Sequence, residues 1–179
     1  MFLEIIKKRR GFFCLLLCVG ICLCGCSHAP TVKRVYSESR FSAEIIWENE
    51  GTEFSATLIA GEPCSDGESR DLSVEFISPD SMKGLRVERK EQTAVLTCGE
   101  ISVELHNQAI LRAADIIASC GSFSYHGATT LGDRELILAE RVCGENRAEL
   151  YIDRESGAPF RAVLGDITVD VVWFEYLSE

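Results

Sequence analysis

The stretch Phe41-Ser42-Ala43-Glu44-Ile45-Ile46-Trp47 decides the fold class, because apolar and polar side chains alternate along most of it. A period of two residues is typical of a strand with one face on a core. The turn signal Asn49-Glu50-Gly51 follows, and Phe54, Ala56 and Leu58 resume the alternation. Two alternating runs separated by a short turn predict a β-hairpin with one apolar face.

The same period recurs along most of the chain and predicts about ten strands. Beyond the hairpin, the runs fall at 72–76, 85–87, 94–98, 101–105, 134–143, 148–153, 160–164 and 167–177. Only 107–119 has helical spacing, with Ile110, Leu111, Ala114 and Ile117 on one face and Asn107 as the candidate N-cap. The fold class is therefore mainly β (α+β): a strongly curved, open antiparallel sheet with one main helix.

The N-terminus indicates where the protein works. Four basic residues, 7–10, precede an uncharged apolar run that ends in Leu23-Cys24-Gly25-Cys26. This run is shorter than the roughly 20 residues that span a bilayer, and it fits a secretory signal peptide. An uncleaved N-terminal anchor remains the alternative.

The four residues Leu23, Cys24, Gly25 and Cys26 resemble the lipobox of bacterial lipoproteins. The resemblance implies that Cys26 carries a diacylglycerol and becomes the first residue after cleavage. We therefore expect a signal peptide at 1–25, a lipidated N-terminus and linker at 26–40, and a folded domain at 41–179. The protein is then held by its acyl chains on the extracytoplasmic face of the cell membrane.

Charge limits the partners. The chain carries a formal net charge of −10 at pH 7, and the signal segment holds four of its 18 basic residues. The mature protein is more acidic still, so phosphate backbones would repel it and nucleic acid is not an expected partner.

Four cysteines follow Cys26, at positions 64, 98, 120 and 143. An extracytoplasmic compartment permits disulfides, but four cysteines allow three pairings and the sequence does not choose among them. Structural disulfides and free thiols both stay open. No pair has the Cys-x-x-Cys spacing of a redox site.

Three stretches resemble the LolA-like group of bacterial envelope proteins, in particular small lipoproteins of Gram-positive anaerobes. Phe41-Ser42-Ala43-Glu44 with Gly51-Thr52-Glu53-Phe54 resembles the opening hairpin of that group. Ser78-Pro79-Asp80-Ser81-Met82-Lys83-Gly84-Leu85 resembles its proline-containing segment, and 151–159 resembles its late strand, turn and proline. The resemblance implies a half-barrel sheet with the helix packed on its concave face.

The resemblance also implies a function. An apolar cavity under the helix would bind a lipid or the acylated chain of a lipoprotein, and it would need several hundred Å³. The candidate wall residues are Phe41, Ile45, Phe54, Leu58, Phe76, Val87, Ile110, Ile117 and Val171. Two alternatives remain: a filled core at the same positions, and a tethered module that binds an envelope protein, such as a component of stress sensing.

The sequence predicts no catalytic residue, no metal site and no cofactor. His106 and His126 lack metal-binding spacing, Ser122 and Ser124 lack an orienting partner, and Glu140 with Glu149 is expected on the solvated face of a hairpin. Trp173 and Phe174 are neighbours in an alternating run, so they are expected on opposite faces. The exposed one would indicate a binding surface.

Overall fold

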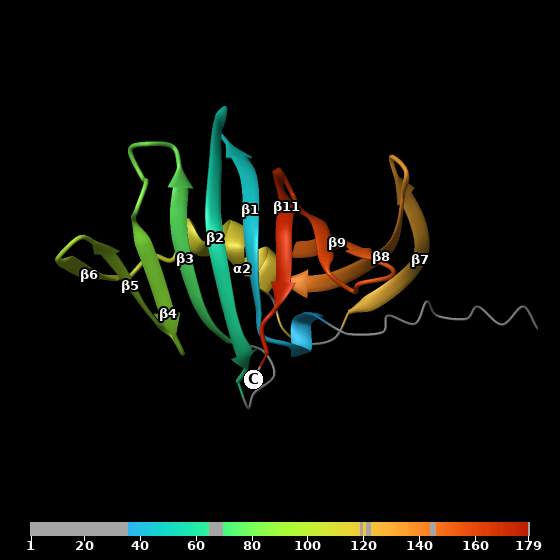
Figure 1. The fold of residues 1–179 in the computed structure, drawn as a ribbon, viewed down its shortest axis with the longest axis horizontal. Helices are drawn as coiled ribbons and strands as arrows, with labels where there is room; N and C mark the ends of the chain where they lie inside the picture. Colours follow the sequence, from blue (N-terminus) through green and yellow to red (C-terminus); the bar gives the residue numbers. More distant parts are fainter. Residues whose placement is uncertain (1–35, 65–69, 119, 121–122, 144–145, 179) are drawn as a thin grey trace, which may run out of the picture.

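A computed structural model describes residues 36–64, 70–118, 120, 123–143 and 146–178. They form one open antiparallel sheet of 11 strands in the order β6-β5-β4-β3-β2-β1-β11-β10-β9-β8-β7 (Figure 1). The strands are β1 (Phe41–Asn49), β2 (Thr52–Pro63), β3 (Arg70–Ser78), β4 (Arg86–Lys90), β5 (Thr93–Cys98), β6 (Ile101–Leu105), β7 (Ser124–Leu131), β8 (Arg134–Cys143), β9 (Asn146–Asp153), β10 (Pro159–Leu164) and β11 (Ile167–Tyr176). The open sheet and its single short helix confirm the predicted fold class.

Two meanders make up this sheet. Strands β1 to β6 run outward to one edge, strands β7 to β11 return from the other edge, and the pairing of β1 with β11 joins them. The first hairpin turns at Glu50 and Gly51, which both have positive φ (51° and 76°). Such a turn matches the twist of two adjacent strands and favours glycine. The predicted hairpin is thus confirmed.

The connection between the two edges carries the helix. A 3-10 turn, η2 (Ala109–Leu111), leads into α2 (Arg112–Ala118), which lies behind the central strands in Figure 1. Asn107 accepts a hydrogen bond from the Ala109 N–H at 2.9 Å, but the N-cap position itself is Gln108. The predicted helix is therefore confirmed, but the α-helix itself is shorter than 107–119, and Asn107 lies one residue before the N-cap.

Strand β7 is the one strand that the sequence pattern does not predict, since residues 124–131 resemble a loop around His126. The pattern is weak because the half-buried positions of the strand include Gly127 and Thr129, while its exposed positions are small or polar. A bulge at His126 also shifts the register against β8. Pairing with β8 overrides this weak local preference.

The core fills the space between the concave face and the helix. Phe41, Ala43 and Ile45 of β1 are fully buried, and the Phe41 ring stacks on Phe174 of β11 with centroids 5.0 Å apart. Phe174 is half-buried, whereas Trp173 is 48% exposed. The prediction that these two neighbours face opposite sides of the sheet is confirmed.

The segment before β1 also packs into this core. A 3-10 turn, η1 (Tyr36–Glu38), buries Tyr36 against Phe41, Phe123 and Phe174. Residues 36–38, which the sequence assigned to the linker, therefore contact the domain. The chain enters the domain at the bottom of the sheet as drawn in Figure 1.

We expect truncation of a buried and of an exposed aromatic side chain to lower the free energy of unfolding by very different amounts. Phe41→Ala should lower the free energy of unfolding by about 3–5 kcal/mol, because it leaves a cavity under the central strands. Trp173→Ala, the control on the exposed face, should cost less than about 1 kcal/mol. Urea unfolding measures both, and equal losses would contradict the assignment of faces.

Candidate functional site

The concave face is packed rather than hollow at the predicted wall. Most of the wall residues have 9% of their surface exposed or less: Phe41, Ile45, Leu58, Phe76, Val87, Ile117 and Val171. Ile110 packs half-buried against the same core, and Phe54 stacks on Trp47 with ring centroids 5.4 Å apart. The structure thus brings the predicted residues together, but as neighbours in a core.

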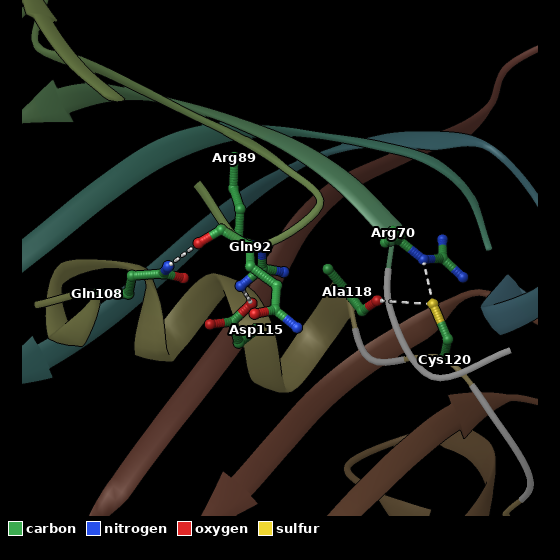
Figure 2. A network of polar contacts seen from close by, with 7 residues as sticks. All are labelled: Arg70, Arg89, Gln92, Gln108, Asp115, Ala118 and Cys120. Atoms are coloured by element: carbon green, nitrogen blue, oxygen red, sulfur yellow. Dashed lines mark hydrogen bonds and ion pairs between the residues drawn. The ribbon is translucent and has the colours of Figure 1, made fainter. Parts of the chain in front are cut away.

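Polar contacts hold the helix on this face (Figure 2). Arg89 of β4 pairs with Asp115 of α2 at 2.6 Å, and the Gln108 side-chain amide donates to the Gln92 carbonyl at 2.9 Å. Burial raises the pKa of Asp115, and the nearby Arg89 guanidinium opposes that shift only in part.

A buried arginine fixes the entry segment. Arg70 is 1% exposed and donates through Nε to Cys120 Sγ at 2.7 Å (Figure 2). Its two terminal nitrogens donate to the carbonyls of Ser37 and Ser39. Its guanidinium also lies 5.4 Å from the centre of the Phe41 ring. Because these carbonyls belong to η1 and the residue after it, Arg70 attaches the N-terminal segment to the domain. Composition and spacing give no signal for a buried arginine.

The convex face offers a different site, where two neighbouring strands separate. Strands β10 and β11 pair only from Arg161–Asp170 to Leu164–Ile167. Beyond that point β11 continues along β1, and Val172 is a bulge residue with no partner opposite Glu44 and Ile45. Strand β10 continues along β9, where Phe160 is a bulge residue between Pro159 and Arg161. Bulges of this kind redirect side chains and end pairing.

The bulge in β11 turns two large apolar side chains outward. Val172 is 54% exposed and Trp173 is 48% exposed, although they are consecutive in a strand. An open pocket of about 210 Å³ lies beside them, and its lining includes Arg134, Asp153, Ser156, Phe160, Val172 and Trp173. The pocket is large enough for one side chain of a partner.

The rim of the pocket is held rigidly. Asp153 Oδ1 accepts hydrogen bonds from the Glu155 N–H (3.1 Å), the Ser156 N–H (2.8 Å) and the Ser156 hydroxyl (2.7 Å). Partial burial tends to raise the pKa of Asp153, but these hydrogen bonds outweigh it and lower the pKa overall. The Tyr176 hydroxyl donates a hydrogen bond to the Ser156 carbonyl at 3.2 Å.

Two carboxylates lie near the exposed tryptophan, in addition to Arg134 in the lining of the pocket. Glu44 lies directly opposite Trp173 in the register, and Glu175 follows two positions along β11. Neither carboxylate takes part in an ion pair within the described part of the chain, whereas Asp170 is paired with Arg161 at 2.5 Å. The site combines an apolar centre with an acidic border, which sequence reasoning anticipated only as an exposed aromatic.

The remaining sequence candidates lie elsewhere. Leu23, Cys24, Gly25, Cys26 and Ser122 fall outside the described residues. His126 is on β7, where Nε2 contacts Glu140 at 3.1 Å, and Glu140 faces Glu149 across β8 and β9 on a solvated surface. Ser124 is the exposed first residue of β7, and His106 is exposed.

Of the later cysteines, Cys64 and Cys98 are free thiols, and the Cys120 thiol accepts a hydrogen bond from Arg70 Nε. Across the described ranges, no group of three or more His, Cys, Asp or Glu side chains is placed to hold a metal ion. Within those same ranges, no helix has the length and hydropathy needed to cross a membrane.

Comparison with known proteins gives structural similarity only. No family model and no curated protein sequence matches the chain. An uncharacterised conserved protein from Thermus thermophilus is similar in structure (TM-score 0.53, 19% identity, 79% of this chain and 81% of the other). MucB is similar over 79% of this chain and 55% of its own length (TM-score 0.51, 14% identity), so the chain spans about half of MucB.

A LolA superfamily protein, NE2245 from Nitrosomonas europaea, is also similar, with a TM-score of 0.43 and 11% identity over 82% of this chain and 89% of its own. The first two similarities, at 19% and 14% identity, indicate a shared fold and not a shared ligand. The observed open sheet with its helix on the concave face is the architecture that the LolA-like resemblance implied.

The two aspartates should give opposite pH dependences. The pKa of Asp153 is lowered from its ordinary value of 3.8, so its native contacts contribute stability above that pH, and this contribution is lost as the pH falls. Relative to Asp153→Asn, the wild type should therefore lose stability on acidification below about 4. Urea unfolding at a series of pH values measures the difference.

Asp115 should show the reverse, because its folded pKa is raised and the native state holds its proton more tightly. Relative to Asp115→Asn, the wild type should lose stability as the pH rises from about 4 through the raised pKa. The same unfolding series measures it. Parallel trends for the two variants would contradict this account of the aspartates.

Proposed function

We propose that this protein is a lipid-anchored envelope protein whose domain binds a protein partner at the convex site around Val172 and Trp173. The acyl chains on Cys26 would hold it at the extracytoplasmic face of the membrane, and the domain would act without catalysis. The observation that carries the proposal is the β11 bulge, which exposes two consecutive apolar side chains next to a preformed pocket.

The character of the surface supports a protein partner. Interface centres are rich in aromatic residues, and binding energy concentrates in a few of them near pockets. Trp173 supplies such a centre, and Glu44 and Glu175, which make no ion pair among the described residues, add negative charge beside it. A partner segment that places an apolar side chain in the pocket and lysine or arginine beside it would match both features.

The similarity to MucB is consistent with this function. MucB has been crystallised in complex with MucA from Pseudomonas aeruginosa, so a protein with this fold can serve as a binding partner. The present chain matches about half of MucB, and the identity of its own partner is left to experiment.

Binding of a lipid or an acylated chain on the concave face is the second candidate function. The observation in its favour is the continuous apolar character of that face. Its side chains are already packed under α2, however, so a ligand could enter only if the helix moved away.

Lipidation is tested directly at Cys26. Cells expressing the full chain should incorporate radiolabelled palmitate into the protein, and Cys26→Ala should abolish the label because it removes the acylated thiol. Cys24→Ala is the matched control and should keep the label. Labelling of the Cys26→Ala protein would overturn the assignment of the anchor.

The convex site is tested by photo-crosslinking in cells. A photoreactive phenylalanine analogue at Val172 of the full chain should give a discrete protein adduct, and adding Trp173→Ala should remove it. The same analogue at Thr168, an exposed residue of the same strand, should give none. An adduct unaffected by Trp173→Ala, or no adduct at Val172, would contradict the proposal.

Native mass spectrometry distinguishes the lipid alternative. We expect the protein to keep its apo mass when titrated with phospholipid, because the candidate wall is filled. A saturable lipid mass that disappears in Ile117→Trp would instead favour the concave face as the functional site. A folded Ile117→Trp protein, checked by circular dichroism, is needed for that comparison.

A further inference from the structure

Strand β6 forms one edge of the sheet and pairs only with β5, at the left end of Figure 1. The two strands turn at Gly99 and Glu100, so Cys98 and Ile101 close a two-residue hairpin. The closing pair of such a hairpin exchanges ladder hydrogen bonds, and the next pair does not. The backbone N–H and C=O groups of Ser102 and Glu104 therefore point toward the open edge.

This five-residue edge has little protection against another strand, because its one charged side chain is Glu104 and it contains no lysine, proline or bulge. Natural edge strands carry lysine, proline, a bulge or an inward-pointing charge. Strand β6 is Ile-Ser-Val-Glu-Leu, and its pairing with β5 is regular throughout. The opposite edge, β7, does carry a bulge, and its exposed residues are small or polar.

The side chains of β6 have two distinct faces. Ile101 and Val103 lie opposite Cys98 and Leu96, on the same face as the buried Ala94, and they are 69% and 52% exposed. They extend the apolar concave face past the area that the helix covers. Glu104 points to the other face and, like Glu100 in the turn, is exposed and makes no ion pair among the described residues.

We propose that β6 is a site of strand addition for an extended partner segment in which apolar residues alternate with lysine or arginine. Its backbone would pair with Ser102 and Glu104, its apolar side chains would cover Ile101 and Val103, and its basic side chains would lie beside Glu104. Charge favours such a partner over a second copy of this chain, whose net charge is −10. The site is separate from the one around Trp173, which lies on β11 beyond five intervening strands.

The test uses the full chain in non-ionic detergent and a labelled peptide in which lysine and valine alternate. Ser102→Pro removes the outward N–H at a position where an edge strand tolerates proline. Ser102→Ala is the matched control, because it keeps the N–H and also loses the side-chain contact to Thr97 Oγ1 (3.2 Å). Fluorescence anisotropy should show saturable binding to the wild type and Ser102→Ala, and binding roughly tenfold weaker to Ser102→Pro.

Two further comparisons make the result specific. A peptide of the same composition with its valines in one block should bind weakly, since it cannot present alternate faces. Trp173→Ala should bind the alternating peptide as the wild type does, so failure of this proposal and failure of the convex site are distinguishable. Matching thermal unfolding of Ser102→Pro and Ser102→Ala establishes that the hairpin is intact.

Three outcomes would overturn the proposal. They are no saturable binding to the wild type above a micelle blank, equal affinity of Ser102→Pro and Ser102→Ala, and equal binding of the blocked peptide. A dimer of the full chain by analytical ultracentrifugation that Ser102→Pro dissociates would also overturn it, because a second copy would then occupy the edge.

Discussion

The pairing of β1 with β11 is the constraint on which the rest of the structure depends. It joins the first strand of the domain to the last and so turns two meanders into one sheet. The stack of Phe41 on Phe174 sits across this pairing, beside Tyr36 of η1. The irregular register within the same pairing puts Val172 and Trp173 on the outside. One ladder thus organises both the core and the proposed binding surface.

This arrangement favours a binding site on the outer surfaces of the sheet over the lipid cavity expected between the concave face and the helix. The residues proposed as the wall of a lipid cavity pack against one another and against α2, which Arg89 holds through Asp115. Among the described residues, the convex site and the β6 edge each present large exposed apolar side chains with carboxylates nearby. Because the chain carries a net charge of −10, these surfaces would bind basic protein segments more readily than anionic lipid.

Much of the fold could be predicted from the sequence, because alternation in β1, β2 and the later strands and the helical spacing of Ile110, Leu111, Ala114 and Ile117 are strong local signals. Strand β7 could not, since Gly127 and Thr129 stand at its half-buried positions and weaken the apolar pattern. The opposite orientations of Trp173 and Phe174 followed from alternation, but the outward turn of Val172 did not. A bulge depends on the partner strand, which no local pattern encodes. The role of Arg70 likewise depends on carbonyls that are distant in sequence.

Hydrogen–deuterium exchange of the full chain, followed by mass spectrometry, tests the central claim most directly. If the β1–β11 ladder unites the sheet, the amides of β1 and β11 should be the last to exchange, and only through global unfolding, while those of the β5–β6 hairpin should exchange earlier through local opening. Exchange of β11 well before β2 and β3 would mean that the two meanders separate independently. It would contradict both the single core and the rigid placement of Val172 and Trp173.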